Sequence, residues 1–248
     1  VLGSAFFSDR SQIAVRMLTH GEQVANEAVI ASRIDAAIAF RESLAIDATA
    51  YRLVHGEADL LPALVVDRYG DYLVVQALTQ GMDRLTPVIV RALEDRLRPK
   101  GILARNDPKT RALEGLPQEV TLLQGEVPEA VSVREGNVEY DVDLRHGQKT
   151  GLFLDQRESR EAAARHARGR VLDCFSYNGG FAMTRSKSLR PPDSRSFGSR
   201  SVSPFSMRAS GNPWSNMFIL QMAHVPRFFS WPYKVRFLGF FPVRSRWW

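Results

Sequence analysis

Apolar and polar residues alternate along several short runs of the chain, which is the pattern of a β-strand with one buried face. Glycine-containing turns around Gly70 and Gly136 fold two of these runs into predicted hairpins. The runs occupy residues 2–18, with a turn at Ser8-Asp9, and residues 51–78, 101–104 and 131–144.

Three other stretches carry apolar residues three or four positions apart, or consist of helix-forming residues, and predict helices. Residues 22–44 predict one amphipathic helix or a pair. The second stretch ends before Pro99, and we expect Asp83 to cap its N-terminus, with Thr86 and Pro87 in its first turn. The third occupies residues 156–167. With the strands, the first two helices predict a compact α+β unit.

The segment from Lys149 to Met183 adds a strand and a glycine turn to the third helix. Residues 171–175 form a short, mainly apolar run of strand length. Residues 176–180 follow as a turn whose two glycines can take positive φ, and the turn opens another helix. Such a turn lets backbone N–H groups approach a nucleotide-like cofactor, although an ordinary strand–helix connection has the same pattern.

Composition indicates a globular protein and excludes a membrane-spanning segment. Of the 248 residues 44% are hydrophobic, and there is no run of 18 apolar residues and no visible signal peptide. The single cysteine, Cys174, excludes an intramolecular disulfide and suits a reducing cytoplasm. Because the first residue is Val, we expect the N-terminus to be the edge of a fragment.

The net charge of +6 comes entirely from the last quarter of the chain. Residues 185–248 hold 11 Lys and Arg and one acid, Asp193, whereas residues 1–184 hold 22 Lys and Arg and 26 Asp and Glu. Residues 185–248 lack helical or strand periodicity, so we expect an irregular tail. The tail is either a basic, aromatic RNA-binding extension or non-native sequence from a reading frame lost after Met183, and the abrupt change of character favours the second.

The strings KTGLFLDQRESR (residues 149–160) and VLDCFSYNGGFA (residues 171–182) closely resemble the ribosomal RNA large-subunit methyltransferase I family. Members of this family are class I enzymes that use S-adenosylmethionine (SAM) to methylate carbon 5 of a cytosine in RNA. The resemblance runs from about Leu2 to Met183. It implies an α/β protein with a remnant of a PUA-like, RNA-binding β-barrel at residues 1–20, a helical linker and central α+β domain at 21–147, and the first part of a Rossmann-like methyltransferase domain at 148–184.

The resemblance also implies a cofactor site. Asp173 would accept from the ammonium group of SAM, Phe153 would pack on the cofactor, and Gln156 or Arg157 would face its carboxylate. A cap of the following turn is the structural alternative for Asp173. The residues expected to bind SAM are Phe153, Asp155, Gln156, Arg157, Asp173, Phe175, Ser176, Tyr177, Asn178 (where the family commonly has Thr), Gly179 and Gly180.

No catalytic residue or metal ligand is assigned. Cytosine-5 methylation uses a cysteine nucleophile, which the family supplies from a later segment, and Cys174 lies inside a predicted strand as a small apolar side chain. Arg10 and Arg16 are candidate contacts for RNA phosphates, with solvated surface arginines as the alternative. For His55, Asp67, Asp107 and His146 we expect structural, linker or surface-loop roles.

The function expected from the resemblance is SAM-dependent cytosine-5 methylation of large-subunit ribosomal RNA, in a truncated and inactive form. Ribosomal RNA is the expected partner, a homodimer is a further candidate, and the expected location is the cytoplasm. The alternative from another class is a non-catalytic RNA-binding protein that uses the central domain and the basic tail.

Overall fold

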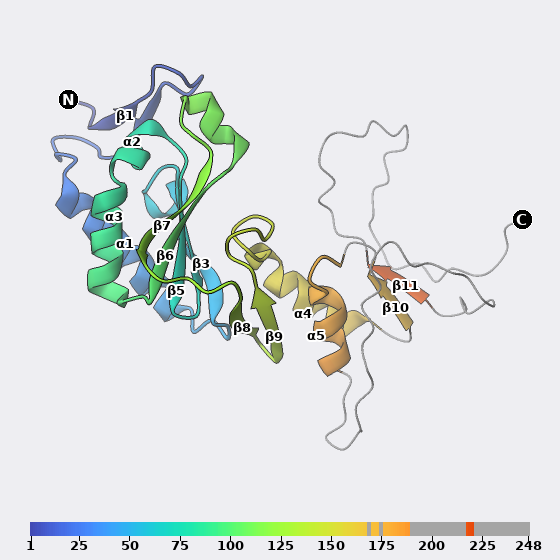
Figure 1. The fold of residues 1–248 in the computed structure, drawn as a ribbon. Helices are drawn as coiled ribbons and strands as arrows, with labels where there is room; N and C mark the ends of the chain where they lie inside the picture. The colour runs from blue at the N-terminus through green and yellow to red at the C-terminus, as the bar shows by residue number, and fades with distance from the viewer. Residues whose placement is uncertain (168–169, 174–175, 189–216, 221–248) are drawn as a thin grey trace, which may run out of the picture. The chain divides into compact units, whose positions relative to one another are not determined.

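A computed structural model describes residues 1–167, 170–173, 176–188 and 217–220 of the chain (Figure 1). The chain divides into two compact units, Val1–Asp155 and Gln156–Trp248. The predicted domain boundaries at residues 20, 147 and 184 remain predictions. Within this division, however, the Lys149–Asp155 segment belongs to the first unit.

A five-stranded mixed sheet forms the centre of the first unit. Its strand order is β3-β4-β5-β6-β7, and all neighbours are antiparallel except β5 and β6, which are parallel. The strands are β3 (Ala50–His55), β4 (Leu64–Tyr69), β5 (Tyr72–Ala77), β6 (Gly101–Asn106) and β7 (Glu119–Gly125).

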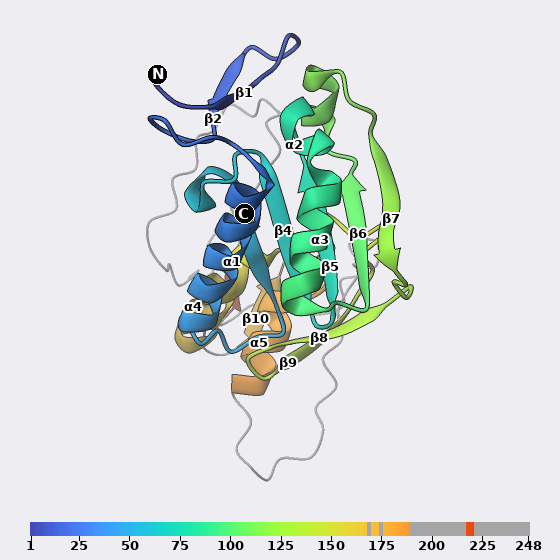
Figure 2. The same cartoon turned by 90° about the vertical axis from the view of Figure 1, so that its left-hand side faces the viewer.

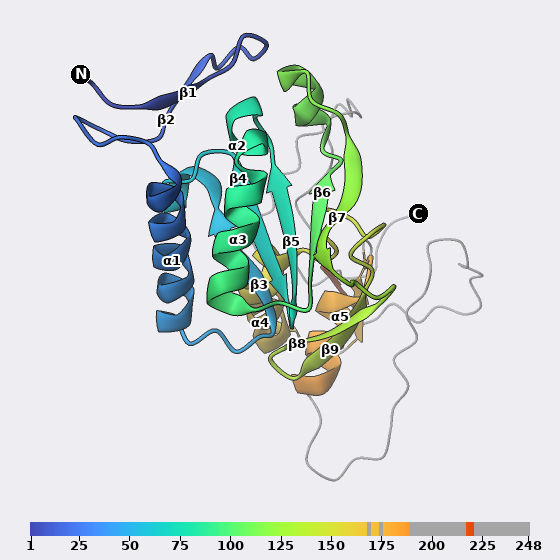
Figure 3. The ribbon, with the colours of Figure 1, turned by 60° about the vertical axis from the view of Figure 1, so that its left-hand side comes forward.

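Two helices, α1 (Glu27–Ser43) and α3 (Thr86–Leu97), lie side by side on one face of this sheet (Figures 2 and 3). A single helix therefore fills the stretch for which a helix pair was the alternative. It begins at Glu27 because the Asn26 side chain accepts from the Val29 amide across 3.0 Å, which caps the first turn. The helices pack their buried faces on one another and on the sheet, with Ile30, Ile34, Ala37, Ile38, Val88, Ile89 and Leu93.

The start of the second predicted helix differs from the sequence expectation. A short helix, α2 (Gln80–Arg84), precedes α3, and Thr79 caps it by accepting from the Met82 amide. Asp83 is therefore inside α2 and caps nothing. Its carboxylate instead accepts from Nη1 of the buried Arg111 across 2.8 Å. Local sequence does not reveal this partner, because it lies 28 residues further along the chain.

Edge strand β7 was also missed, since none of the predicted strand runs includes residues 119–125. Residues Glu119–Leu122 do alternate polar and apolar, but this run covers only four positions and ends at the apolar pair Leu122-Leu123, and its apolar side chains are exposed at the edge of the sheet. Short 3₁₀ helices complete the connections: η1 (Gly56–Asp59), η2 (Lys109–Glu114) and η3 (Leu154–Gln156).

Three predicted hairpins are present, and one of them, β4–β5 around Gly70, belongs to the central sheet. Strands β8 (Val131–Glu135) and β9 (Val138–Val142) pair around Gly136 and bury alternate residues on one face. Near the N-terminus, β1 (Ala5–Phe7) pairs with β2 (Val15–Met17). Phe7, Ile13, Val15 and Met17 are exposed in this first hairpin. The expected PUA-like origin of residues 1–20 remains a prediction.

The second unit contains the predicted helix–strand–turn–helix order. Its elements are α4 (Arg157–His166), β10 (Arg170–Asp173), α5 (Gly180–Ser188) and β11 (Met217–Leu220). Strand β11 pairs in parallel with β10, from Arg170 with Met217 to Asp173 with Leu220. The expectation of an irregular tail is therefore wrong for these four residues, because the run Met-Phe-Ile-Leu is apolar and of strand length without being periodic. The rest of the tail lies almost wholly outside the described residues.

Candidate cofactor site

The face of the five-stranded sheet opposite the helices carries polar anchors. Side chains alternate along β4, so Leu64 and Val66 enter the apolar core beneath the helices. Asp67 and Tyr69 therefore lie on the opposite face of the sheet. Asp67 and Tyr69 are nevertheless fully buried, at 0% exposure. Part of this cover comes from the segment 143–155 of the same unit, whose Thr150 and Leu152 contact them directly.

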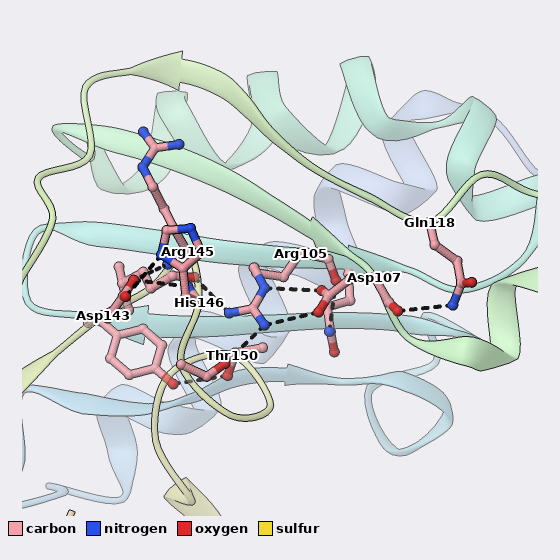
Figure 4. Close-up of polar contacts among 11 residues, drawn as sticks. Arg105, Asp107, Gln118, Asp143, Arg145, His146 and Thr150 are labelled. Carbon is pink, nitrogen blue, oxygen red and sulfur yellow. Dashed lines mark hydrogen bonds and ion pairs between the residues drawn. The ribbon is translucent and has the colours of Figure 1, made fainter.

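Arg105 on β6 holds the beginning of this covering segment (Figure 4). Its guanidinium donates to the carbonyl of Leu144 across 2.8 Å and to that of Gly147 across 3.0 Å. The same guanidinium donates through Nε and Nη2 to the two carboxylate oxygens of Asp107, each across 3.0 Å. Asp107 thus has the structural role expected for it, as the charge partner of a buried arginine.

Asp143 closes the turn that follows. Its Oδ1 accepts from the amides of Arg145 (2.8 Å) and His146 (2.9 Å), and Oδ2 lies 3.0 Å from Nδ1 of His146. Burial raises the pKa of the Asp143 carboxyl, but the hydrogen bonds from these amides and the His146 ring outweigh it and hold the pKa below its ordinary value. The His146 side chain is 83% exposed, which agrees with the linker role expected for it.

Asp67 holds the next part of the segment. The Arg52 guanidinium on β3 donates to both carboxylate oxygens, across 2.8 and 3.0 Å, and the Thr150 hydroxyl donates to Oδ2 across 2.6 Å. The hydrogen bond to Asp67 raises the pKa of Arg52 above its ordinary value. The Tyr69 hydroxyl lies 2.9 Å from Oγ1 of Thr150 and accepts from the Leu152 amide across 3.1 Å.

Two of the predicted cofactor residues, Phe153 and Asp155, gather around Lys149. The Lys149 ammonium lies 4.6 Å from the centre of the Phe153 ring and 3.1–3.2 Å from the carboxylate oxygens of Asp155. Burial raises the pKa of Asp155, but the hydrogen bond and charge of Lys149 outweigh it and lower the pKa below its ordinary value. The backbone of Lys149 has φ +55°, a conformation that residues with a side chain rarely adopt.

The second unit holds the other predicted residues. Gln156 stands before the first residue of α4 without a side-chain cap, and Arg157 pairs with its neighbour Glu158 across 2.5 Å. Asp173 ends β10, with Oδ2 shielded from solvent. Ser176, Tyr177, Asn178 and Gly179 form the turn into α5, which begins at Gly180, whereas Phe175 lies outside the described residues, as does Cys174.

Of the two glycines that can take positive φ in this turn, one does so. Positive values occur at Tyr177 (+44°) and Gly179 (+74°), and not at Gly180. A Cβ at Gly180 would lie 2.8 Å from Cδ of Arg160, so the missing side chain makes room for an arginine of α4. Arg160 is buried, at 2% exposure. Gly180 therefore packs helix against helix, and its contact with a cofactor remains a prediction.

The two candidate RNA-binding arginines have acidic neighbours in the first unit. Arg16 lies 3.5 Å from the buried carboxylate of Glu114, and Arg10 lies 3.7 Å from Asp9. Arg16 thus has a structural partner, and its side chain is only 20% exposed. RNA binding by either residue remains a prediction.

Sequence reasoning did not assign Lys149, Thr150, Tyr69 and Arg52 to the site, and it gave Asp67 only a structural role. A signal was available at Asp67, an acid inside an apolar run of strand length. Among the described residues, no group of three or more His, Cys, Asp or Glu is placed to hold a metal ion. No helix in the described part of the chain is both long and apolar enough to cross a membrane.

Curated relatives match about three quarters of the chain. The ribosomal RNA large subunit methyltransferase I of Aliivibrio fischeri is 40% identical over 190 residues, which are 73% of this chain and 47% of the relative. The protein of the same name from Photobacterium profundum is 38% identical over 187 residues, with the same coverage. The chain is similar to part of these methyltransferases. It spans about half the length of the curated relatives it matches.

Solved structures share the fold. A protein of Streptococcus mutans assigned as a SAM-dependent methyltransferase superposes with a TM-score of 0.63 at 24% identity, over 75% of this chain and 48% of that chain. A second protein assigned as a methyltransferase, solved in complex with S-adenosylhomocysteine (SAH), superposes with a TM-score of 0.64 at 24% identity and the same coverage. No family model matches the chain. The four proteins described above are named as methyltransferases, and none is named as a non-catalytic RNA-binding protein.

Proposed function

We propose that this chain is the cofactor-binding part of a SAM-dependent methyltransferase that modifies carbon 5 of a cytosine in large-subunit ribosomal RNA. The observation that carries the proposal is the β10–turn–α5 unit. An acid, Asp173, ends the strand, Gly179 turns the chain at φ +74°, and a nine-residue helix begins at Gly180. The similarity to proteins named ribosomal RNA large subunit methyltransferase I supports the substrate class, and the names of the structural neighbours support the cofactor.

The residues of the second unit fit the amino-acid end of SAM. The first amides of a helix have no partner within the helix, so the N-terminus of α5 offers donors to a carboxylate. The shielded carboxylate of Asp173 supplies an acceptor for an ammonium group. We assign the turn Ser176–Gly180 to this end of the cofactor, with Gln156 or Arg157 as a further donor and Phe175 as an apolar wall.

In the first unit, Phe153 and Asp155 are proposed as cofactor contacts in their own right. The Phe153 ring is half-buried and offers an apolar surface to the adenine or ribose, and Asp155 is an exposed acceptor that Lys149 keeps ionised. SAM, when bound, supplies an activated methyl group. The residues of this chain bind and orient the cofactor, and they hold its charged groups in a fixed place.

Transfer to carbon 5 of cytosine needs a thiolate that attacks carbon 6. The sequence contains one cysteine, Cys174, inside the predicted strand run 171–175, where a thiol packs as an apolar side chain. We therefore propose that the 248-residue chain binds SAM but does not methylate RNA. The proposal places it in the cytoplasm with ribosomal RNA as partner, and it retains a homodimer as a prediction that sedimentation tests.

Calorimetry of the full chain with SAM and SAH tests the proposed site. We expect saturable binding of both, and Asp173→Asn should weaken it about tenfold or more, because the negative charge that pairs with the ammonium group is lost. Glu161→Gln, an exposed acid of α4, is the control and should bind as the parent does. Absence of binding by the parent chain would contradict the proposal, and incorporation of labelled methyl into ribosomal RNA would contradict the predicted inactivity.

A further inference from the structure

A directed chain of hydrogen bonds joins strand β4 to the segment Lys149–Asp155. The Asp67 carboxylate, which accepts two hydrogen bonds from the Arg52 guanidinium, has no proton to donate. The Thr150 hydroxyl therefore donates its proton to Oδ2 of Asp67. Oγ1 of Thr150 must then accept from the Tyr69 hydroxyl, 2.9 Å away. Tyr69 in turn accepts from the Leu152 amide. The order of donation is therefore fixed, from Leu152 through Tyr69 and Thr150 to Asp67.

The side chains that form this series of hydrogen bonds are shielded from water, except that of Arg52. Asp67 and Tyr69 are 0% exposed and Thr150 is 1% exposed. Burying a carboxylate is costly, and a well-packed apolar group of the same volume often stabilises a fold as well or better. A contribution to the free energy of unfolding therefore does not by itself explain an acid at position 67. Directional hydrogen bonds, unlike apolar contacts, specify one backbone conformation.

The conformation that they specify is an unusual one. Lys149 has φ +55°, and Gly151 has φ +136° and lies so close to β9 that a Cβ there would be 2.7 Å from Cγ1 of Val142. Thr150 and Leu152, on either side of Gly151, are the two anchored residues. A strained turn persists when its surroundings over-determine it, and such turns are concentrated at binding sites.

What the anchored turn presents is Lys149, Phe153 and Asp155, which contact one another through the Lys149 ammonium. We propose that Asp67 is a positioning residue of the cofactor site, which acts through Thr150 and Tyr69 to hold the Lys149–Asp155 segment in its binding conformation. The inference rests on the proposed function for its link to SAM. The anchoring itself rests on the contacts within the first unit.

Thr150→Val tests the anchoring because it keeps the shape of the side chain and removes both of its hydrogen bonds. Amide exchange followed by NMR should show the Leu152 amide exchanging about tenfold faster, the loss expected for one ordinary hydrogen bond. Thr150→Ser, which keeps the hydroxyl, should restore slow exchange. The matched control is Thr19→Val: Thr19 is also fully buried, donates to the Gln23 carbonyl across 2.6 Å and accepts from the Ser4 amide. It should lower the melting temperature without changing exchange at Leu152.

Calorimetry of the same variants of the full chain with SAH links the anchoring to the cofactor. We expect Thr150→Val to weaken SAH binding about tenfold, Thr150→Ser to bind like the parent, and Thr19→Val to bind like the parent at a lower melting temperature. Unchanged exchange at Leu152 in Thr150→Val would overturn the inference, as would equal losses of affinity in Thr150→Val and Thr19→Val. If the parent chain binds no SAH, the proposed function fails, and the exchange rates alone decide whether Asp67 anchors the segment.

Discussion

The Thr150 hydroxyl donates to Oδ2 of Asp67 across 2.6 Å and joins two residues that are 83 positions apart in the sequence. Asp67 belongs to a strand of the central sheet, and Thr150 belongs to the string KTGLFLDQRESR that carries the resemblance to methyltransferases. The contact therefore connects the scaffold to the candidate site within one compact unit. It also assigns a structural role to Asp67, a buried acid of the sheet.

Tyr69→Phe should make the protein less sensitive to alkali. Burial raises the pKa of the Tyr69 hydroxyl, and the nearby charge of Asp67 raises it further, so the folded-state pKa lies above the unfolded-state value of about 10. A raised pKa contributes stability that is fully present below about pH 10 and is lost as the pH rises from there towards the folded-state value. Denaturant unfolding from pH 8 to 11.5 should show this loss, up to about 1.4 kcal/mol per pH unit above pH 10, in the parent only.

Equal alkaline losses in parent and Tyr69→Phe would contradict this assignment. At pH 7 the variant should also lose stability, by about 1–3 kcal/mol, because the Leu152 amide and the Thr150 hydroxyl lose a buried partner.

Lys149→Met should raise the pKa of Asp155. Burial already raises this pKa, and in the parent the Lys149 ammonium more than compensates. Removal of the ammonium therefore leaves burial as the larger influence. A pH titration of the Asp155 carboxyl by NMR measures the change, with Lys109→Met, at an exposed site, as the control. A pKa of Asp155 that stays the same in Lys149→Met would show that another group sets it.

Arg111→Met should destabilise the first unit strongly. Arg111 is 1% exposed; its Nε donates to the Pro117 carbonyl across 2.8 Å, and its Nη1 donates to Asp83 and to the Ala77 carbonyl. Methionine fills similar space but leaves these acceptors without a donor, which we expect to cost about 3 kcal/mol. Urea unfolding measures the change, and Arg84→Met, exposed on α2, should cost less than about 0.5 kcal/mol. A small effect at Arg111 would mean that water replaces its hydrogen bonds.

Gly81→Ala should loosen the N-terminal hairpin from the unit. A Cβ at position 81 would lie 2.4 Å from Cδ1 of Phe6 on β1, so the ring must move. We expect a loss of about 1–3 kcal/mol and faster proteolysis of residues 1–18. A double-mutant cycle with Phe6→Ala isolates the contact, because the alanine at position 81 should cost much less once the ring is gone. Additive losses of unfolding free energy in the double mutant would show that Gly81→Ala does not act through Phe6.

The sequence by itself determined the elements whose pattern is local. The alternation around Gly136, the helical stretch before Ser43 and the strand–turn–helix order from Val171 onward all follow from the spacing of neighbouring residues, and the structure contains each of them. Edge strand β7 was not predicted because its alternation covers only Glu119 to Leu122, and the role of Asp83 was not predicted because its partner, Arg111, is distant in the sequence.

The residues of the candidate site also fall into those that the sequence predicted and those that only the tertiary structure identified. Motif spacing named Phe153, Asp155, Asp173 and the glycine turn, because the chain itself brings these residues close to a turn or a strand end. Only the tertiary structure decided that Asp67, Tyr69 and Arg105 hold the segment in place, and that Gly180 makes room for Arg160. Such contacts join residues that are 20 to 83 positions apart, and a hydrogen bond depends on distance and angle in space, which local sequence does not encode.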